Sequence, residues 1–514
     1  MTNQKFALGF TLLYALLLGW FMQYHELWFD ETEPWLLALY SNSYADLLHN
    51  KRFEGHPNLW YSLLYIITKS TSSLRALQVT QAVFAVGFVY VFLRYAPFPR
   101  VLKVLICFGY YGLFEYGIIS RLYALELFTL FLLCHFYPKR FSHWYLYLTL
   151  LAVHAQTNLF GFFFSGVMGL VLFSEAFRLW KETAPLVSLS TSQKVLGLLL
   201  WTLGCAFSFW SMVRPNETGG NLITFWHPYY FYQAASRIWQ AFAPVPVLII
   251  PFWNTSFLRT VFEIPLSALL MALIVGKLYR TKQLLIPLLL LFITLLLFFA
   301  LKWEGSIRHH AHFFFYTLAF LWLQSYYGQG NTLSHPFQFL NRWSAYLLPY
   351  VLLICASLQV VAGVYALSVE KKYPFYGGKQ VAQFLQTLPA TSVVVINDLV
   401  TASNVTAYYG RPVLHLPTGV FRSFYTLDPN EVNDLGPYRL LDWAGALAQR
   451  INKPVVLICR EELPYQWHSS PVKFLKAYKG DYITSFSFFI YEIPPLPLPK
   501  KYMVADLPLK KKTP

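Results

Sequence analysis

The stretch LLIPLLLLFITLLLFFAL, residues 284–301, is a run of 18 residues without a charged side chain. A helix of that length extends about 27 Å, close to the ~30 Å hydrocarbon core of a lipid bilayer. Similar runs recur along the chain, of which 56% is hydrophobic and only 12% is charged. Soluble domains carry about 25% charged residues. The sequence therefore predicts an α-helical polytopic membrane protein.

Eleven apolar segments are candidates for membrane-spanning helices. They are residues 6–24, 75–94, 102–119, 122–137, 144–155, 159–172, 195–212, 265–277, 284–301, 312–326 and 345–367. Acidic and aromatic residues follow the first segment, and no small-residue cleavage site does, so it is interpreted as a retained helix and not as a signal peptide.

The net charge of +16 makes nucleic acid a partner to consider. The basic residues, however, gather in the short connections 94–103, 139–140, 178–194 and 277–282. Positive short loops are typical of the cytoplasmic side of a membrane protein, so nucleic acid is not expected and the N-terminus is placed inside. The expected outer stretches are 25–74, the turn before Arg121, 214–257, 302–311 and the chain after 367.

From about residue 368 the apolar runs give way to alternating strand-like and helical segments. The strand-like ones are TSVVVIND (391–398), RPVLHL (411–416), KPVVLIC (453–459) and YITSFSFFIYEI (482–493). This pattern predicts a small extracytoplasmic α/β domain at 368–493, after a membrane domain at 1–367 whose first outer loop is 25–74. The Pro- and Lys-rich tail, 494–514, is expected to be disordered. The expected location is the inner (cell) membrane.

Ionisable side chains form four groups on the predicted outer face. They are Asp30 and Glu31 with Glu33 nearby; Glu54 and His56; Glu115, Arg121, Tyr123 and Glu126; and Lys302, Arg308, His309, His310 and His312. Such side chains are costly at membrane depth, so they are usually paired or functional. Carboxylates suit a divalent cation or general-base catalysis, and an arginine can bind two phosphate oxygens. Together they indicate group transfer from a phosphorylated lipid.

Four motifs carry a family resemblance. WFDETEPW (28–35), EGHPNLWY (54–61), FEYGIISRLYAL (114–125) and SIRHHAHFF (306–314) resemble the membrane glycosyltransferases of the GT-C fold. The nearest branch is the bacterial one related to protein O-mannosyltransferases and lipid A aminoarabinose transferases. The resemblance covers the membrane domain and implies transfer of a sugar from a polyprenyl-phosphate carrier, undecaprenyl or dolichyl, to an outer glycan, lipid or protein, with inversion at the anomeric carbon.

The resemblance also implies catalytic roles. Asp30 would deprotonate the acceptor with support from Glu31, and Asp30 and Glu115 would hold Mg²⁺ or Mn²⁺. The second acid is usually an aspartate in relatives, whereas here Glu115 and Glu126 compete. Glu115 is preferred, because Glu126 should lie about a turn and a half along the next helix.

Further residues are expected to contact the substrates. They are His56, Glu54, Arg121, Tyr123, Lys302, Arg308, His309 and His310. Among them Arg308, with the two histidines after it, would contact the lipid phosphate. The first-loop motif has His-Pro-Asn at 56–58, where His-Pro-Pro is common in relatives, and this difference leaves the sub-family and substrate open.

Other interpretations of the same residues are structural or non-catalytic. Asp30 and Glu31 can cap a helix that begins near Pro34. Glu115 can form a buried ion pair with Arg121. A transporter or flippase would also contain intramembrane charges, but it predicts an inverted repeat and helices broken near the midplane, which the sequence does not display. A non-catalytic binder of a lipid-linked sugar is a further alternative.

Overall fold

The computed structural model describes residues 2–177, 189–213, 227–327, 335–428, 435–463 and 471–495. The chain divides into two compact units. The first, which we call the bundle unit, consists of Met1–Gln23, Gly55–Trp60 and Gln78–Val369. The second, the loop–sheet unit, consists of Tyr24–Glu54, Tyr61–Leu77 and Glu370–Pro514. Most of the first outer loop thus groups with the C-terminal part of the chain and not with the helices that flank it.

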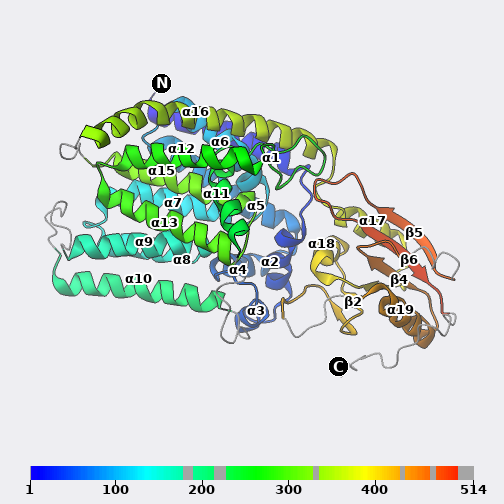
Figure 1. Ribbon diagram of the computed structural model, residues 1–514. Coiled ribbons are helices and arrows are strands. Elements are labelled where there is room, and N and C mark those ends of the chain that lie inside the picture. Colours follow the sequence, from blue (N-terminus) through cyan, green and yellow to red (C-terminus); the bar gives the residue numbers. More distant parts are fainter. Residues whose placement is uncertain are drawn as a thin grey trace. The chain divides into compact units, whose positions relative to one another are not determined.

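The bundle unit is built from long helices that run side by side (Figure 1). Its elements are α1 (Asn3–Met22), α5 (Leu74–Tyr95), α6 (Arg100–Phe108), η1 (Tyr110–Ile118), α7 (Tyr123–Phe136), η2 (Tyr137–Lys139), α8 (Trp144–Ala155), α9 (Leu159–Ala176), α10 (Thr191–Met212), α11 (Pro228–Phe242), α12 (Thr260–Leu278), α13 (Lys282–Leu301), α14 (Ile307–His310), α15 (His312–Gln324) and α16 (His335–Lys372). Each of the eleven apolar segments contributes to these helices, and segment 102–119 overlaps both α6 and η1.

Eight helices in the described part of the chain are long and apolar enough to cross a membrane. The apolar helices α7, α8 and α15 have only 14, 12 and 13 residues. A perpendicular crossing needs about 20 residues, so these three are short for it. The mostly helical fold is confirmed, and the number of spans stays a prediction.

Helix α11 lies within the stretch 214–257, which was expected to be an outer loop. The backbone N–H of Trp239 in α11 donates to the hydroxyl of Ser267 in α12 at 2.9 Å. The side chain of Gln240 donates to Glu263 of α12 at 2.8 Å. These contacts make α11 part of the packed bundle.

The loop–sheet unit combines short helices with one mixed sheet (Figure 1). Its helices are α2 (Phe29–Tyr40), α3 (Tyr44–Asn50), α4 (Leu59–Thr68), α17 (Gly378–Thr387), α18 (Leu399–Tyr409) and α19 (Pro437–Ile451). Its strands are β1 (Val393–Ile396), β2 (Val413–His415), β3 (Val420–Arg422), β4 (Val455–Cys459), β5 (Lys473–Tyr478) and β6 (Phe488–Ile493). The strand-like segments correspond to β1, β2, β4 and β6, and the small C-terminal sheet is confirmed.

The sheet has the order β3-β2-β1-β4-β6-β5. Strands β2, β1 and β4 are parallel, while β3, β6 and β5 pair antiparallel. The central strands β1 and β4 are almost wholly buried and rich in valine and isoleucine, as expected for strands covered on both faces. The Pro/Lys-rich tail lies outside the described residues from position 496 onward.

Polar contacts attach the first outer loop to helix α18. The backbone N–H of Leu27 donates to the hydroxyl of Tyr408 at 2.9 Å, and the Asn404 side chain donates to the carbonyl of Leu27 at 3.3 Å. One turn further, the hydroxyls of Thr32 and Ser403 lie 3.5 Å apart. The acidic motif of α2 is therefore positioned by the C-terminal domain.

Candidate functional site

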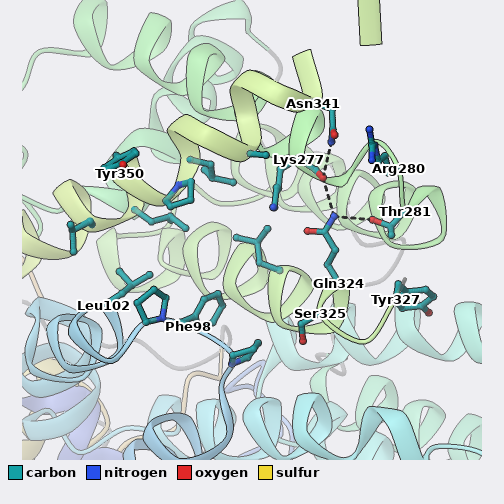
Figure 2. A pocket seen from close by; sticks show the side chains of 18 of the residues that line it. Phe98, Leu102, Lys277, Arg280, Thr281, Gln324, Ser325, Tyr327, Asn341 and Tyr350 are labelled. Carbon is teal, nitrogen blue, oxygen red and sulfur yellow. Dashed lines mark hydrogen bonds between the residues drawn. The ribbon is translucent and has the colours of Figure 1, made fainter. Parts of the chain in front are cut away.

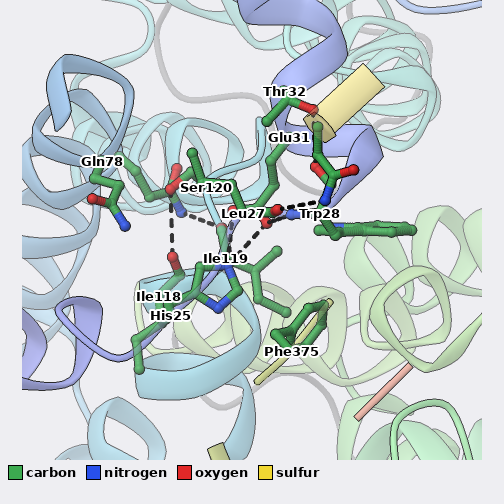
Figure 3. A network of polar contacts seen from close by, with 12 residues as sticks. His25, Leu27, Trp28, Glu31, Thr32, Gln78, Ile118, Ile119, Ser120 and Phe375 are labelled. Carbon is green, nitrogen blue, oxygen red and sulfur yellow. Dashed lines mark hydrogen bonds and ion pairs between the residues drawn. The ribbon is translucent and has the colours of Figure 1, made fainter. Parts of the chain in front are cut away.

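A buried histidine lies at the entrance to the acidic motif (Figure 3). Nε2 of His25 is 2.9 Å from Glu31 Oε2, and Nδ1 is 2.5 Å from Glu370 Oε1. The three side chains are at most 2% exposed. Burial lowers the pKa of His25, but the two carboxylates outweigh it and raise the pKa to about 10. His25 is therefore an imidazolium that joins the loop to the end of α16.

Glu31 and Asp30 are adjacent but have different surroundings. Helix α2 begins at Phe29, earlier than the expected start near Pro34. Glu31 Oε2 accepts a hydrogen bond from the backbone N–H of Trp28 at 3.0 Å in addition to its pairing with His25. Glu31 therefore caps the helix, as the structural interpretation expected, whereas Asp30 is only partly buried. Of the two acids, Asp30 is the more accessible.

Glu33, one turn further into α2, is a buried acid of a different kind. It is 1% exposed, and neither carboxylate oxygen has a hydrogen-bond partner within 3.5 Å among the described residues. Burial, together with the nearby Glu54 and Asp30, raises the pKa of Glu33 well above its usual value. Burial also lowers the pKa of Lys51 to about 8 against the opposing effect of Glu54. Glu33 therefore keeps its proton to a higher pH than an ordinary glutamate.

Replacing Glu33 by glutamine is expected to flatten the pH dependence of stability. Because the folded-state pKa of Glu33 is raised, its contribution to folding stability is greatest below about pH 4.5. That contribution is lost as pH rises through the folded-state pKa. Glutamine mimics the protonated acid. As pH rises above about 4.5, Glu33→Gln should therefore gain stability relative to the wild type, by up to about 1.4 kcal/mol per pH unit. Thermal melts from about pH 5 to about pH 9 measure the slope. Equal slopes in both proteins would contradict the assignment, and Glu462→Gln, half-exposed in the same unit, is the control.

In the bundle unit Glu115 lies on the π-helix η1, a rare geometry that often marks functional sites. Gly112 permits the tight turn that precedes it, because an added Cβ would lie 2.4 Å from the carbonyl oxygens of Ile106 and Cys107. The hydroxyl of Tyr14 donates to the carbonyl of Gly112 at 2.7 Å. The position of Glu115 is thus determined by close backbone packing.

Trp253 connects Glu115 to Arg308. Its indole Nε1 donates to Glu115 Oε2 at 2.9 Å, and the guanidinium of Arg308 lies over its ring, 5.0 Å from the ring centre. The hydroxyl of Tyr116 donates to the backbone carbonyl of Arg308. Glu115 is 1% and Arg308 9% exposed. An acid, an aromatic face and a cation are therefore held together; we call these three residues the bundle cluster.

The histidines after Arg308 make different contacts. Nδ1 of His309 accepts from the backbone N–H of Ser306 at 2.9 Å, so the neutral ring carries its proton on Nε2. Its ring also lies 5.9 Å from that of Tyr123. Nε2 of His310 donates to the carbonyl of Glu304 at 2.9 Å. Nε2 of His309 is therefore a donor, whereas the contact of His310 with Glu304 fixes the loop.

Glu126, the competing second acid, is engaged in a buried network. Its Oε2 lies 2.8 Å from Nε2 of His312 and accepts from the side chain of Asn158 at 2.6 Å. Nδ1 of His312 donates to the carbonyl of His309 at 2.6 Å. Glu126 is fully buried and its contacts can be those of a structural residue, and the preference for Glu115 as the second acid stays a prediction.

The expected site residues fall in both units. The loop–sheet unit contains Asp30, Glu31 and Glu54, and the bundle unit contains His56, Glu115, Arg121, Tyr123, Lys302, Arg308, His309 and His310. Gly55 separates Glu54 from His56 at φ 69°, where glycine is favoured. Within the bundle unit Arg121 follows the π-helix and is 8% exposed, and Lys302 ends α13. The contacts described above join Tyr123 to His309, and Arg308 to Glu115 through Trp253.

Sequence reasoning did not select three residues of these networks. Trp253 bridges two selected residues, but it follows Phe252 in an aromatic-rich stretch, where interfacial aromatics are common. His25 and Glu370 are each isolated in the sequence. The signal for this pair is that both lie within three residues of an apolar segment, where a charge usually has a partner.

The expected divalent cation would need Asp30 and Glu115 as ligands, and these belong to different units. In the described part of the chain, no group of three or more His, Cys, Asp or Glu side chains is arranged to hold a metal ion. A Mg²⁺ or Mn²⁺ site therefore stays a prediction, and no step of the proposed reaction depends on it. Comparison with family models, with curated proteins and with solved structures gives no match to this chain.

Proposed function

We propose that this chain is an integral membrane glycosyltransferase that moves a sugar from a polyprenyl-phosphate carrier to an acceptor on the outer face. The observation that carries the proposal is the bundle cluster, in which Trp253 holds Glu115 and lies under Arg308. An arginine suits the phosphate of a lipid carrier, and an aromatic face suits an apolar sugar surface. Eight apolar helices suit a substrate that stays in the membrane.

Arg308 is assigned the role of stabilising the departing phosphate. In a direct displacement, negative charge develops on the phosphate oxygen as its bond to the anomeric carbon breaks. A guanidinium in a buried setting stabilises that charge more strongly than it would in water. The proton on Nε2 of His309 can supply a second hydrogen bond to the same group.

Asp30 is assigned the role of general base toward the acceptor. Its carboxylate takes the proton of the acceptor hydroxyl, and the oxygen forms a bond to the anomeric carbon while the bond to phosphate breaks. The products are the glycosylated acceptor and free polyprenyl phosphate, and one displacement inverts the anomeric centre. Glu31 positions Asp30 through the cap of α2 and the pair with His25.

Arg308→Ala is expected to weaken donor binding. A hydrogen bond to a charged group contributes about 1.5–3 kcal/mol, so the Kd for a polyprenyl-phosphate sugar should rise about 10- to 150-fold. The fold of α14 should persist, because Tyr116 holds the backbone carbonyl and not the side chain. Titration of the labelled donor measures the Kd. Arg259→Ala, an exposed arginine that precedes α12, is the matched control, and equal affinities in both variants would contradict the phosphate assignment.

The proposal is tested by turnover with purified full-length protein in lipid nanodiscs. The donor panel comprises polyprenyl-phosphate sugars, the corresponding polyprenyl-pyrophosphate sugars and nucleotide sugars. We expect release of polyprenyl phosphate and a sugar-bearing product with the first class alone. Saturable donor binding without turnover, given a range of glycan, lipid and peptide acceptors, would instead support a lipid-linked sugar binder or transporter.

A further inference from the structure

A large cavity in the bundle unit lies apart from the candidate site residues, none of which is among its described lining residues. Its volume is about 830 Å³, and it lies among the loop before α6, the end of α12, the end of α15 and the first half of α16 (Figure 2). Much of its wall is apolar, with Phe98, Leu102 and Leu348 among the lining residues. We call it the α12–α16 cavity. Its size falls within the range of ligand pockets and far exceeds a free phosphate ion.

One end of this cavity is cationic. Lys277 and Arg280, at the end of α12, line it, and Figure 2 shows the Lys277 side chain directed into it. No carboxylate is among its described lining residues. Nε of Arg280 is buried and has no hydrogen-bond partner among the described residues. Two cations beside an apolar wall require an anionic partner with an apolar body.

The polar edge between these cations is built from amides. Gln324 of α15 donates to the carbonyl of Lys277 at 2.9 Å, and Asn341 of α16 donates to the carbonyl of Gly276 at 2.7 Å. Both amides thereby satisfy carbonyls that the end of α12 leaves without helical partners. The two amides and the two cations lie toward one end of the cavity, whereas Leu102 and Tyr350 lie toward the other (Figure 2).

Helix α16 presents exposed aromatic side chains beside the cavity. They are Phe339, Trp343, Tyr346 and Tyr350, each more than two-fifths exposed. Tyr350 also lines the cavity. Exposed Trp and Tyr are typical of the headgroup level of a bilayer, so the cavity mouth would lie where lipid headgroups meet acyl chains.

We infer that the α12–α16 cavity binds one anionic glycerophospholipid of the surrounding membrane. Its phosphate lies against Lys277 and Arg280, and its acyl chains follow Phe98, Leu102 and Leu348. The inference rests on membrane insertion of the bundle but is independent of sugar transfer. A lipid fits this cavity better than a free phosphate, because a free phosphate would leave the apolar wall uncovered.

The test is native mass spectrometry of the full-length protein with an equimolar mixture of phosphatidylglycerol and phosphatidylcholine of matched acyl chains. The wild type is expected to retain phosphatidylglycerol preferentially. Each basic residue near a membrane contributes about fivefold to anionic-lipid affinity, so Lys277→Gln with Arg280→Gln should weaken it about thirtyfold. Millimolar inorganic phosphate should not displace the lipid, and displacement would overturn the assignment in favour of a small-anion site.

The matched control is Lys282→Gln with Arg342→Gln, which removes the same charge near the same helix ends but from residues that do not line the cavity. It should retain phosphatidylglycerol as the wild type does. Ala345→Phe, which narrows the cavity and keeps both cations, should lower retention at least several-fold. Equal losses in both double variants, or full retention in Ala345→Phe, would overturn the proposal.

Discussion

Replacing His25 by alanine is expected to unfold the loop–sheet unit at a much lower temperature. The change leaves Glu31 and Glu370 as buried carboxylates without their shared cation, and breaking a buried ion pair costs about 3–5 kcal/mol. At about 2–4 °C per kcal/mol, the melting temperature should fall by about 6–20 °C. In the wild type this contribution is complete below about pH 6.5 and is lost as pH rises through the folded-state pKa of about 10.

Thiol labelling of Cys459 can report the unfolding of the loop–sheet unit separately from that of the bundle unit. Cys459 is buried in β4, and the other four cysteines of the chain belong to the bundle unit. With those four replaced by alanine, a thiol-reactive dye reports only the opening of the sheet. His49→Ala, an exposed histidine in the same unit, should change stability by less than about 0.5 kcal/mol.

A double variant separates the ion pair from general loss of packing. Adding Glu370→Gln to His25→Ala removes one of the two carboxylates that have lost the His25 cation, so it should restore part of the lost stability. A melting temperature of His25→Ala equal to that of His49→Ala would show that the buried cation does not hold the loop to the sheet.

The sequence predicted the helices of the bundle well, because apolar runs are local signals. Residues 284–301 lie within α13, and residues 345–367 lie within α16. It did not predict that the first outer loop groups with the C-terminal sheet. That grouping depends on contacts such as the one between Leu27 and Tyr408, which are 381 positions apart. No local periodicity carries such information.

In the candidate site, too, the sequence predicted local motifs but not the contacts between remote residues. Arg308 and its neighbouring histidines form a compact motif, and the structure connects Arg308 to Glu115 through Trp253. Trp253 itself is 138 positions from Glu115, and nothing local distinguishes it from an interfacial tryptophan. Glu31 differs from Asp30 through its contacts with the backbone of Trp28 and with His25. The cap was expected, whereas the pairing with His25, which also contacts the remote Glu370, was not.

The difference in burial between Asp30 and Glu31 leads to the second prediction, a large loss of turnover in Asp30→Asn. Asp30→Asn removes the proposed base but preserves the size and polarity of a partly exposed side chain. Loss of a general base lowers kcat by about 10²–10⁴-fold, so turnover should fall by that factor while the melting temperature changes by no more than a few degrees. Because the donor phosphate is assigned to Arg308, the donor Kd should stay close to that of the wild type.

Glu31→Gln should behave in the opposite way, which makes it the discriminating partner. It weakens the pair with His25 and the cap at Trp28, so the melting temperature should fall, whereas kcat per folded molecule should stay within about tenfold of the wild type. Measuring kcat, donor Kd and the melting temperature for both variants separates catalysis from positioning. If Glu31→Gln abolished turnover while Asp30→Asn retained it, the base would be Glu31, and the accessibility of Asp30 would have no catalytic meaning.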